Sequence, residues 1–369
     1  MRVALQYPFE AYGEPCGPGA GVVGDTRTLG LAVSGGSDSL AMLALAAEIR
    51  THDGGLSLAA VTVDHGLRPE AAAEAEQVGR ICHELGVPHS IVRWERADTG
   101  AVSQADARRA RHQLLATWAA AHGVSQIALA HTRDDRLETF LMRARQGSGW
   151  YGLAGLMPYA PSPVWPQGAA LRLVRPLLAF TREDLRDDLR ARGIAWIDDP
   201  SNAADRFERV RMRRLLARLP PSTKDTAIRT MDRLAEMRMA TASAAFELLS
   251  RHVDQQASTA RLPLDSRYLV GPESWRRFIE AMVMAAGGAV IPPRGEGLAR
   301  LLDLIASHDP ALRGGVTLAG AKIRTGTGVL LGFSRAPRRS GQGTGPSGQP
   351  DWERAARLLQ PTNLGPLWV

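Results

Sequence analysis

The stretch that decides the fold is LGLAVSGGSDS, residues 29–39. LGLAV (29–33) is a short apolar run that predicts a buried strand, and the residues after the serine-rich turn continue in a helical pattern to Arg50. The hexapeptide between them therefore lies where backbone N–H groups converge on a bound anion. We expect it to bind phosphate through Ser34, Gly35, Gly36, Ser37, Asp38 and Ser39.

This loop lacks the lysine of the GxxxxGK[ST] pattern, in which the lysine reaches the β- and γ-phosphates. A serine–glycine cradle without lysine is suited to holding a pyrophosphate group while reaction takes place at the α-phosphate. The alternative is an ordinary serine–glycine turn with a capping aspartate. The setting between a buried strand and a helix favours the phosphate-binding interpretation.

Strands and helices alternate on the C-terminal side of this loop. Further apolar strands are predicted at LAAVTVD (58–64), PHSIVRW (88–94), QIALAH (126–131) and LRLVRPLL (171–178). Helices are predicted between these strands at 69–86, 103–122 and 133–145. This order predicts an α/β fold with a doubly wound, mostly parallel sheet. The carboxyl ends of its strands would meet at one edge, where ligands bind.

The remaining sequence predicts four parts. They are an N-terminal extension (1–28), an ATP-binding catalytic domain with a helical end (29–219), a smaller and mainly helical C-terminal module (222–335), and a flexible tail (336–369). Pro220-Pro221 marks the boundary after the catalytic domain. The extension contains a GxGxxG pattern, but no strand precedes it, so we do not expect a dinucleotide site there.

Composition limits the class of protein. Apolar residues make up 44% and charged residues 22% of the 369 positions, which is typical of globular chains. Cys16 and Cys82 are the only cysteines and form no CxxC pair, so neither a disulfide scaffold nor a cysteine-rich zinc site is expected. No apolar run approaches the roughly 18 residues that span a bilayer, and no secretion signal is apparent. We therefore expect a cytoplasmic protein without membrane partners.

The charge is positive and carried by arginine. Forty-five basic residues oppose 38 acidic ones, and because Lys224 and Lys322 are the only lysines, 43 of the 45 are arginines. Codon bias in a GC-rich genome and binding of a polyanion both explain such an excess. Six of the arginines lie within 206–218, where a helix would place Arg206, Arg209 and Arg213 on one face and Leu215, Leu216 and Leu219 as apolar anchors. This cluster favours a surface that binds RNA phosphates.

Two motifs place polar residues at the predicted ligand edge. VDHGLR (63–68) ends the second strand with Asp64 and His65, and AHTRDDRLETF (130–140) follows the fourth strand. Asp134 and Glu138 are spaced i,i+4, so their carboxylates share a helix face and could hold Mg²⁺ or an amine. The alternative is that these acidic residues only begin a helix, where their negative charge interacts favourably with the helix dipole. A second glycine-rich loop, RQGSGWYGLAGL (145–156), lies beside the first or only connects two domains.

The SGGSDS loop resembles that of the N-type ATP pyrophosphatases, which release pyrophosphate from ATP. With VDHGLR, HTRDDRLET, RQGSG…GLAG and DPSN, it resembles the tRNA-isoleucine lysidine synthetases over residues 29–218 and more weakly to about 335. That resemblance implies ligation of free L-lysine to carbon 2 of the wobble cytidine in a minor isoleucine tRNA with a CAU anticodon. Adenylation of the cytosine by ATP with Mg²⁺ would come first. Another ATP pyrophosphatase, an ammonia-dependent synthetase or a tRNA thiolase, is the alternative.

The resemblance also implies roles for individual residues. Catalysis would fall to Asp38, Asp134, Asp135 and Glu138, with Asp38 and Asp135 as Mg²⁺ ligands. ATP would be bound by the 34–39 loop together with Asp64, His65, His131, Arg145 and Gly147. RNA would be bound by Arg108, Arg111, Arg206, Arg209, Arg211 and Arg213. The helical end of the 29–219 domain and the 222–335 module would both contact the tRNA. The sequence departs from the family pattern at His112, where a tyrosine is usual, and at Val210, where an asparagine is usual. It leaves open whether a homodimer forms.

Overall fold

The structure is a computed structural model that describes residues 28–53, 56–66, 70–95, 103–197, 208–289, 291–326, 329–337 and 349–360. The chain divides into two compact units, which meet along the sequence at Ala235 and Glu236. None of the helices in these ranges combines the length and hydropathy that crossing a bilayer requires. Each unit is described by itself.

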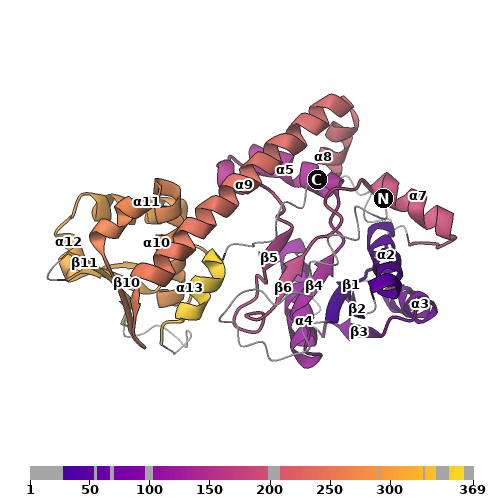
Figure 1. Cartoon of the computed structure of the whole chain (residues 1–369), viewed down its shortest axis with the longest axis horizontal. Coiled ribbons are helices and arrows are strands. Elements are labelled where there is room, and N and C mark those ends of the chain that lie inside the picture. The colour runs from indigo at the N-terminus through magenta and orange to yellow at the C-terminus, as the bar shows by residue number, and fades with distance from the viewer. Residues whose placement is uncertain are drawn as a thin grey trace. The chain divides into compact units, whose positions relative to one another are not determined.

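Unit 1 is built on a six-stranded sheet (Figure 1). Its spatial order is β3 (His89–Arg93), β2 (Ser57–Asp64), β1 (Thr28–Ala32), β4 (Gln126–Leu129), β6 (Arg172–Val174) and β5 (Tyr159–Pro161). All neighbours pair in parallel except β5, which runs antiparallel to β6. The expected doubly wound, mostly parallel sheet is confirmed, and β5 is an addition from the proline-rich stretch.

Helices cover both faces of this sheet because its strands are apolar on both sides. Leu29 and Leu31 pack into a core with α2 (Ser37–Asp53), α3 (Ala71–Glu84) and α7 (Arg182–Arg192). Ala32 packs on the opposite face, together with residues of α4 (Gln104–Ala121). The parallel order brings the carboxyl ends of β1, β2, β4 and β6 to the same edge, which positions the site.

Three further helices of unit 1 lie around α5 (Arg133–Arg145). They are α6 (Trp150–Leu153), α8 (Glu208–Ala217) and the long helix α9 (Pro221–His252), which begins in unit 1. Leu137 of α5, Leu216 of α8 and Met231 of α9 form a small buried cluster of their own. α5 is therefore fixed from outside the sheet as well as by it.

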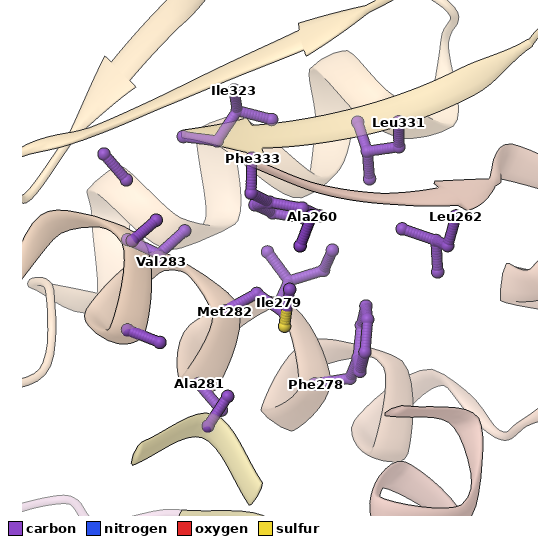
Figure 2. Packing of buried hydrophobic residues seen from close by; sticks show 14 of the residues in the cluster. Ala260, Leu262, Phe278, Ile279, Ala281, Met282, Val283, Ile323, Leu331 and Phe333 are labelled. Atoms are coloured by element: carbon purple, nitrogen blue, oxygen red, sulfur yellow. The ribbon is translucent and has the colours of Figure 1, made fainter. Parts of the chain in front are cut away.

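Unit 2 contains a second sheet that the sequence did not predict. Five antiparallel strands follow the order β7 (Asp254–Gln255), β8 (Thr259–Pro263), β11 (Leu330–Arg335), β10 (Ala321–Thr325) and β9 (Val316–Leu318). Helical segments accompany them at η3 (Leu264–Leu269), α10 (Pro272–Gly287), α11 (Gly295–Ala306) and α12 (Ala311–Gly314). Figure 2 shows Phe278, Ile279 and Met282 of α10 directed toward strand residues such as Phe333.

One expectation for the tail is wrong. Residues 336–369 were expected to be flexible, but Trp352–Leu359 form α13, with Asp351 as its N-cap. Ala355 and Leu359 are buried in the core of unit 2, and the backbone N–H of Asp351 donates to the carbonyl of Ala285. The apolar face of this short helix explains the difference, because composition alone hides such a stripe.

Candidate active site

The SGGSDS loop connects β1 to α2 in the conformation that an anion site needs. Gly35 has φ +85°, and a Cβ there would come 2.8 Å from Cδ1 of Ile197. Ser39 Oγ accepts from the backbone N–H of Ser34 (3.1 Å) and donates to the carbonyl of Gly36 (3.0 Å). The first N–H groups of α2 have no partner within the helix. The loop is held by its own hydroxyls and presents donors to a bound anion.

The carboxylates of α5 follow β4 at the same edge. Thr132 and Asp135 cap the helix reciprocally: the Thr132 hydroxyl accepts from the backbone of Asp135, and Asp135 Oδ2 accepts from the backbone N–H of Thr132 at 2.9 Å. Asp135 is 6% exposed and Glu138 is fully buried. The acidic helix start is thus a helix cap, and two of its carboxylates are also buried.

Arg182, in the first turn of α7, binds all four candidate catalytic carboxylates. Its guanidinium donates to Asp38 Oδ2 at 3.3 Å, to Asp135 Oδ1 at 2.7 Å and to Glu138 Oε1 at 2.8 Å. Its backbone N–H donates to Asp134 Oδ2 at 2.8 Å. Arg182 was not predicted from the sequence, because one arginine among 43 carries no local signal beyond its place after the capping threonine.

A cavity of about 310 Å³ opens between these elements. The phosphate loop, the end of β4 and side chains of α4, α5, α7 and α8 line it. Its charged lining consists of Arg111, Arg182, Arg186, Arg209 and Arg213 against Asp38 and Asp135. Positive charge therefore predominates beside the loop, which suits a polyphosphate.

The titration behaviour of two lining groups follows from their surroundings. Burial raises the pKa of Asp38 above its usual value, with the nearby Asp135 adding to the shift and Arg182 opposing it. Burial alone would also raise the pKa of Asp135, but Arg182 and the other cationic and hydrogen-bonding neighbours outweigh it and hold that pKa below its usual value. Asp135 is therefore a persistent anion and Asp38 is the more basic carboxylate.

Two histidines of unit 1 are held neutral by their surroundings. Burial and the guanidinium of Arg175 lower the pKa of His131, whose Nδ1 accepts a hydrogen bond from Arg175 Nε at 3.2 Å. Burial and the neighbouring arginines lower the pKa of His112 to about 4. His131 lines the cavity as expected for a residue near ATP, and it does so as an uncharged group.

The α8 arginines lie differently from the expected RNA-facing surface. Arg213 Nε donates to Glu138 Oε1 at 2.7 Å, and Arg209 lies 4.0 Å from Asp135 and 3.8 Å from Glu138. Both line the cavity, whereas Arg211 is exposed. Arg206 lies outside the described residues. The predicted helix thus directs part of its positive charge inward.

The predicted apolar anchoring of this helix needs a correction. Leu215 is 45% exposed and does not anchor α8. Leu216 is 8% exposed and Leu219 packs against its cluster, so these two predicted anchors are confirmed; Val210 and Met212, each 8% exposed, complete the buried side of the helix. Val210, which stands where the family has asparagine, is part of this apolar contact. The error came from the helical phase, which the sequence did not define.

Several other predicted residues do not reach the cavity. Asp64 accepts from the backbone of Gly66 at 2.8 Å and from Arg93 Nε at 3.1 Å, so it stabilises the turn after β2. His65 is half-buried next to Trp94, and burial lowers its pKa. Neither residue lines the cavity.

The remaining predicted contacts lie at helix surfaces. Arg145 ends α5 and Gly147 follows it, about 15 Å along the helix from Asp135. The Gly147 N–H donates to the carbonyl of Ala144, so it is not free for phosphate. Arg108 is exposed and does not line the cavity, although its neighbour Arg111 does.

Asp38 and Asp135 fit Mg²⁺ by donor chemistry. Each directs one oxygen to the Arg182 guanidinium, so the two carboxylates lie close together at the cavity. Mg²⁺ is commonly bound by one or two carboxylates with substrate phosphates and water. Within the described ranges, no group of three or more His, Cys, Asp or Glu could hold a metal ion. An ion here would therefore rely on the phosphates of its nucleotide.

Fold and loop together define the class of protein. The profile of the PP-loop domain family matches residues 14–219, more than half of the chain, so this is a PP-loop ATP-utilising protein. A U34-tRNA thiolase from Methanococcus maripaludis, NcsA, solved with its [4Fe-4S] cluster, shares the fold. It has a TM-score of 0.50 and 17% identity, over 63% of this chain and 78% of that one.

Sequence relatives define the family more narrowly. The tRNA(Ile)-lysidine synthase of Hyphomonas neptunium is 46% identical over 80% of this chain and 78% of its own length. That of Rhodopseudomonas palustris is 40% identical over 85% and 91%, respectively. The chain belongs to the tRNA(Ile)-lysidine synthase family. The resemblance noted from the motifs is confirmed, and the chain is an enzyme of the type that forms a carbon–nitrogen bond in tRNA.

Proposed function

We propose that this enzyme joins free L-lysine to carbon 2 of the wobble cytidine of an isoleucine tRNA with a CAU anticodon, in the cytoplasm, using ATP with Mg²⁺. One observation carries the proposal. A phosphate-binding loop and two cavity-lining carboxylates, Asp38 and Asp135, face the same arginine-rich cavity. ATP and an amine could therefore meet a nucleobase in one place.

The reaction has two steps, adenylation of the cytosine and displacement of AMP by lysine. The cytosine O2 attacks the α-phosphorus of ATP, so an O–P bond forms, the bond to the bridging oxygen breaks, and pyrophosphate leaves. The ε-nitrogen of lysine then attacks carbon 2, the C–O bond breaks, and AMP leaves. The lysine ammonium must lose a proton before it can attack, and a carboxylate at the site is a suitable acceptor.

The first step uses the donors around the phosphates. The α2 N-terminus and the loop hydroxyls would hold the leaving pyrophosphate, since donors fixed in place stabilise developing charge without reorganisation. Arg111 lines the cavity, and among the described residues no carboxylate is paired with it. Burial and the neighbouring Arg108 lower the pKa of Arg111, which indicates a cation in need of an anion. We assign Arg111 to a phosphate of ATP rather than to the RNA backbone.

The second step uses the carboxylates that reach the cavity. Asp38 and Asp135 line it, whereas Glu138 is fully buried behind Arg182 and Arg213. One of the two aspartates would accept the proton, and Glu138 would act as the buried counterion of the arginines. Mg²⁺, held by the same two aspartates and the phosphates, would supply positive charge to the polyphosphate.

The cysteines support ligation over sulfur transfer. Burial raises the pKa of Cys82 to about 12, so it is a thiol rather than a reactive thiolate at neutral pH. Cys16 lies outside the described residues. A thiolation mechanism that depends on a pair of reactive cysteines has no support in this chain.

Nucleoside analysis tests the proposal. Purified protein is incubated with ATP, labelled lysine and an isoleucine tRNA that carries a CAU anticodon, and the tRNA is then digested. We expect one labelled nucleoside with the mass of lysidine, and none when ATP is omitted or the tRNA carries a GAU anticodon. Incorporation of ammonia into a small molecule without RNA would contradict the proposal.

A further inference from the structure

Among the residues that the structure describes, Arg182 alone binds every candidate catalytic carboxylate, and it does so with four separate donors. Nε binds Asp38, Nη2 binds Asp135, Nη1 binds Glu138, and the backbone N–H binds Asp134. Asp38 belongs to α2 and the other three belong to α5. Arg182, which belongs to α7, therefore connects α2 to α5.

The carboxylates need such a bridge because they repel one another. Glu138 is fully buried and Asp135 is 6% exposed, and buried charges are tolerated only when they are paired and hydrogen-bonded. Arg213 also donates to Glu138, but the contacts of Arg209 are long, at 3.8–4.0 Å. Among the ion pairs of the described residues, Asp38 pairs with Arg182 alone.

Arg182 is itself held on both sides. Thr181 accepts from the backbone N–H of Asp184 and forms a capping box with it, which fixes the start of α7. The backbone N–H of Arg133 donates to the carbonyl of Phe180 at 2.8 Å, which ties the start of α5 to the residues just before α7. The guanidinium of an arginine is planar, and its N–H groups point in fixed directions. When its backbone is also fixed, it sets the distances between its carboxylate partners, which the flexible ammonium group of a lysine does not do.

We propose that Arg182 is a positioning residue for lysidine formation, which sets the separation and orientation of Asp38 and Asp135 in the cavity. This inference rests on the proposed function. Its rival is that Arg182 merely docks α7 against the rest of unit 1. The two can be separated because the same helix carries a second arginine that makes a bridge of the same kind.

Arg192 provides the matched control. It donates to Glu48 of α2 at 2.6 Å and to Asp188 of α7 at 2.7 Å, and it is 25% exposed, against 19% for Arg182. Both arginines thus bridge α7 to α2, but the Arg192 bridge lies ten residues further along α7 and does not line the cavity. Arg182→Met and Arg192→Met remove the same guanidinium and keep a similar volume.

Steady-state kinetics and unfolding of these two variants form the test. We expect Arg182→Met to lower kcat on the order of 100-fold, the loss typical of misplaced reacting groups, with KM for tRNA within about threefold. We expect Arg192→Met to leave kcat unchanged, and both variants to keep a cooperative unfolding transition. Equal losses of kcat in the two variants, or wild-type kcat in Arg182→Met, would overturn the inference.

Recovery of kcat in Arg182 variants is a further measurement, which should not change if Arg182 only docked α7. Arg182→Lys retains the charge but lacks the fork, so it should recover only part of the loss. Guanidinium chloride at millimolar concentration should raise kcat of Arg182→Ala severalfold in a saturable way, whereas sodium chloride of equal ionic strength should not. Equal effects of the two salts would count against positioning.

The test also separates the inference from the proposed function. If the wild-type protein forms no lysidine, the proposed function fails. Whether Arg182 sets the placement of Asp38 and Asp135 is then still tested by calorimetric binding of MgATP. We expect at least tenfold weaker binding to Arg182→Met than to wild type, and wild-type affinity for Arg192→Met. Unchanged MgATP affinity in Arg182→Met, with active wild-type protein and unchanged kcat, would refute the positioning role alone.

Discussion

Arg175 donates its Nε–H to Nδ1 of His131 over 3.2 Å. Because a guanidinium is always a donor, His131 must accept at Nδ1 and carry its proton on Nε2. We therefore expect His131 to be neutral at all pH values at which the enzyme works. In NMR spectra, its ring resonances should not titrate between pH 5 and 8. A His131 resonance with a midpoint near 6.5 would contradict this.

His112 should make the protein sensitive to acid. Burial and the surrounding arginines lower its pKa in the folded state from 6.5 to about 4. The unfolded chain therefore binds more protons between these values, and the free energy of unfolding falls as pH drops from about 6.5 to about 4, by up to about 3 kcal/mol. Denaturant melts at several pH values should show a shallower decline for His112→Tyr.

Gly35→Ala should damage the phosphate loop. An alanine would have to adopt φ +85° and place its Cβ 2.8 Å from Ile197 Cδ1. The left-handed conformation alone costs about 1–2 kcal/mol. We expect lower stability by at least that amount and loss of ATP binding, measured by denaturant unfolding and calorimetry. Gly36→Ala is the control for stability, since its nearest neighbour is 3.9 Å away and its φ is not positive.

Two ion pairs between α5 and α9 should differ in strength. Arg136 is 2% exposed and donates to Asp232 at 2.5 Å, whereas the Arg133–Asp225 pair has side chains 29% and 48% exposed. Removing one partner of a buried charge costs up to about 3 kcal/mol, and an exposed pair contributes less than about 1 kcal/mol. Asp232→Ala should therefore lower the unfolding free energy far more than Asp225→Ala. Equal losses in chemical denaturation would contradict the burial argument.

The two sides of α8 should separate RNA binding from chemistry. Arg211 is exposed, so Arg211→Ala should weaken tRNA binding and lower the slope of log K against log salt by about 1, without affecting kcat. Arg213→Ala removes a donor from the buried Glu138, so it should lower kcat at least tenfold while changing that slope little. Filter binding at several salt concentrations and lysine-incorporation rates would show whether the effects divide in this way.

The sequence predicted the parts of the fold that depend on local pattern. Apolar runs located β1, β2, β3 and β4, and the SGGSDS motif located the turn between β1 and α2 that lines the cavity, because strand period and turn chemistry are local properties. The convergence of four carboxylates on Arg182 was not predictable, since contacts 44 to 144 residues apart leave no trace in spacing. The phase of α8 also escaped prediction, because arginines occupy both its exposed and its inward faces.

Helix α9 has a consequence for how such an enzyme can be divided. The two units meet at Ala235 and Glu236, which lie inside this 32-residue helix rather than in a linker. Met231, Ala227 and Ile228 belong to the apolar cluster that covers Leu137 of α5. A catalytic fragment that stopped at the Pro220-Pro221 turn would leave this cluster uncovered. The smallest autonomous catalytic piece must carry the first four turns of α9, so recombination at the prolines would not yield exchangeable modules.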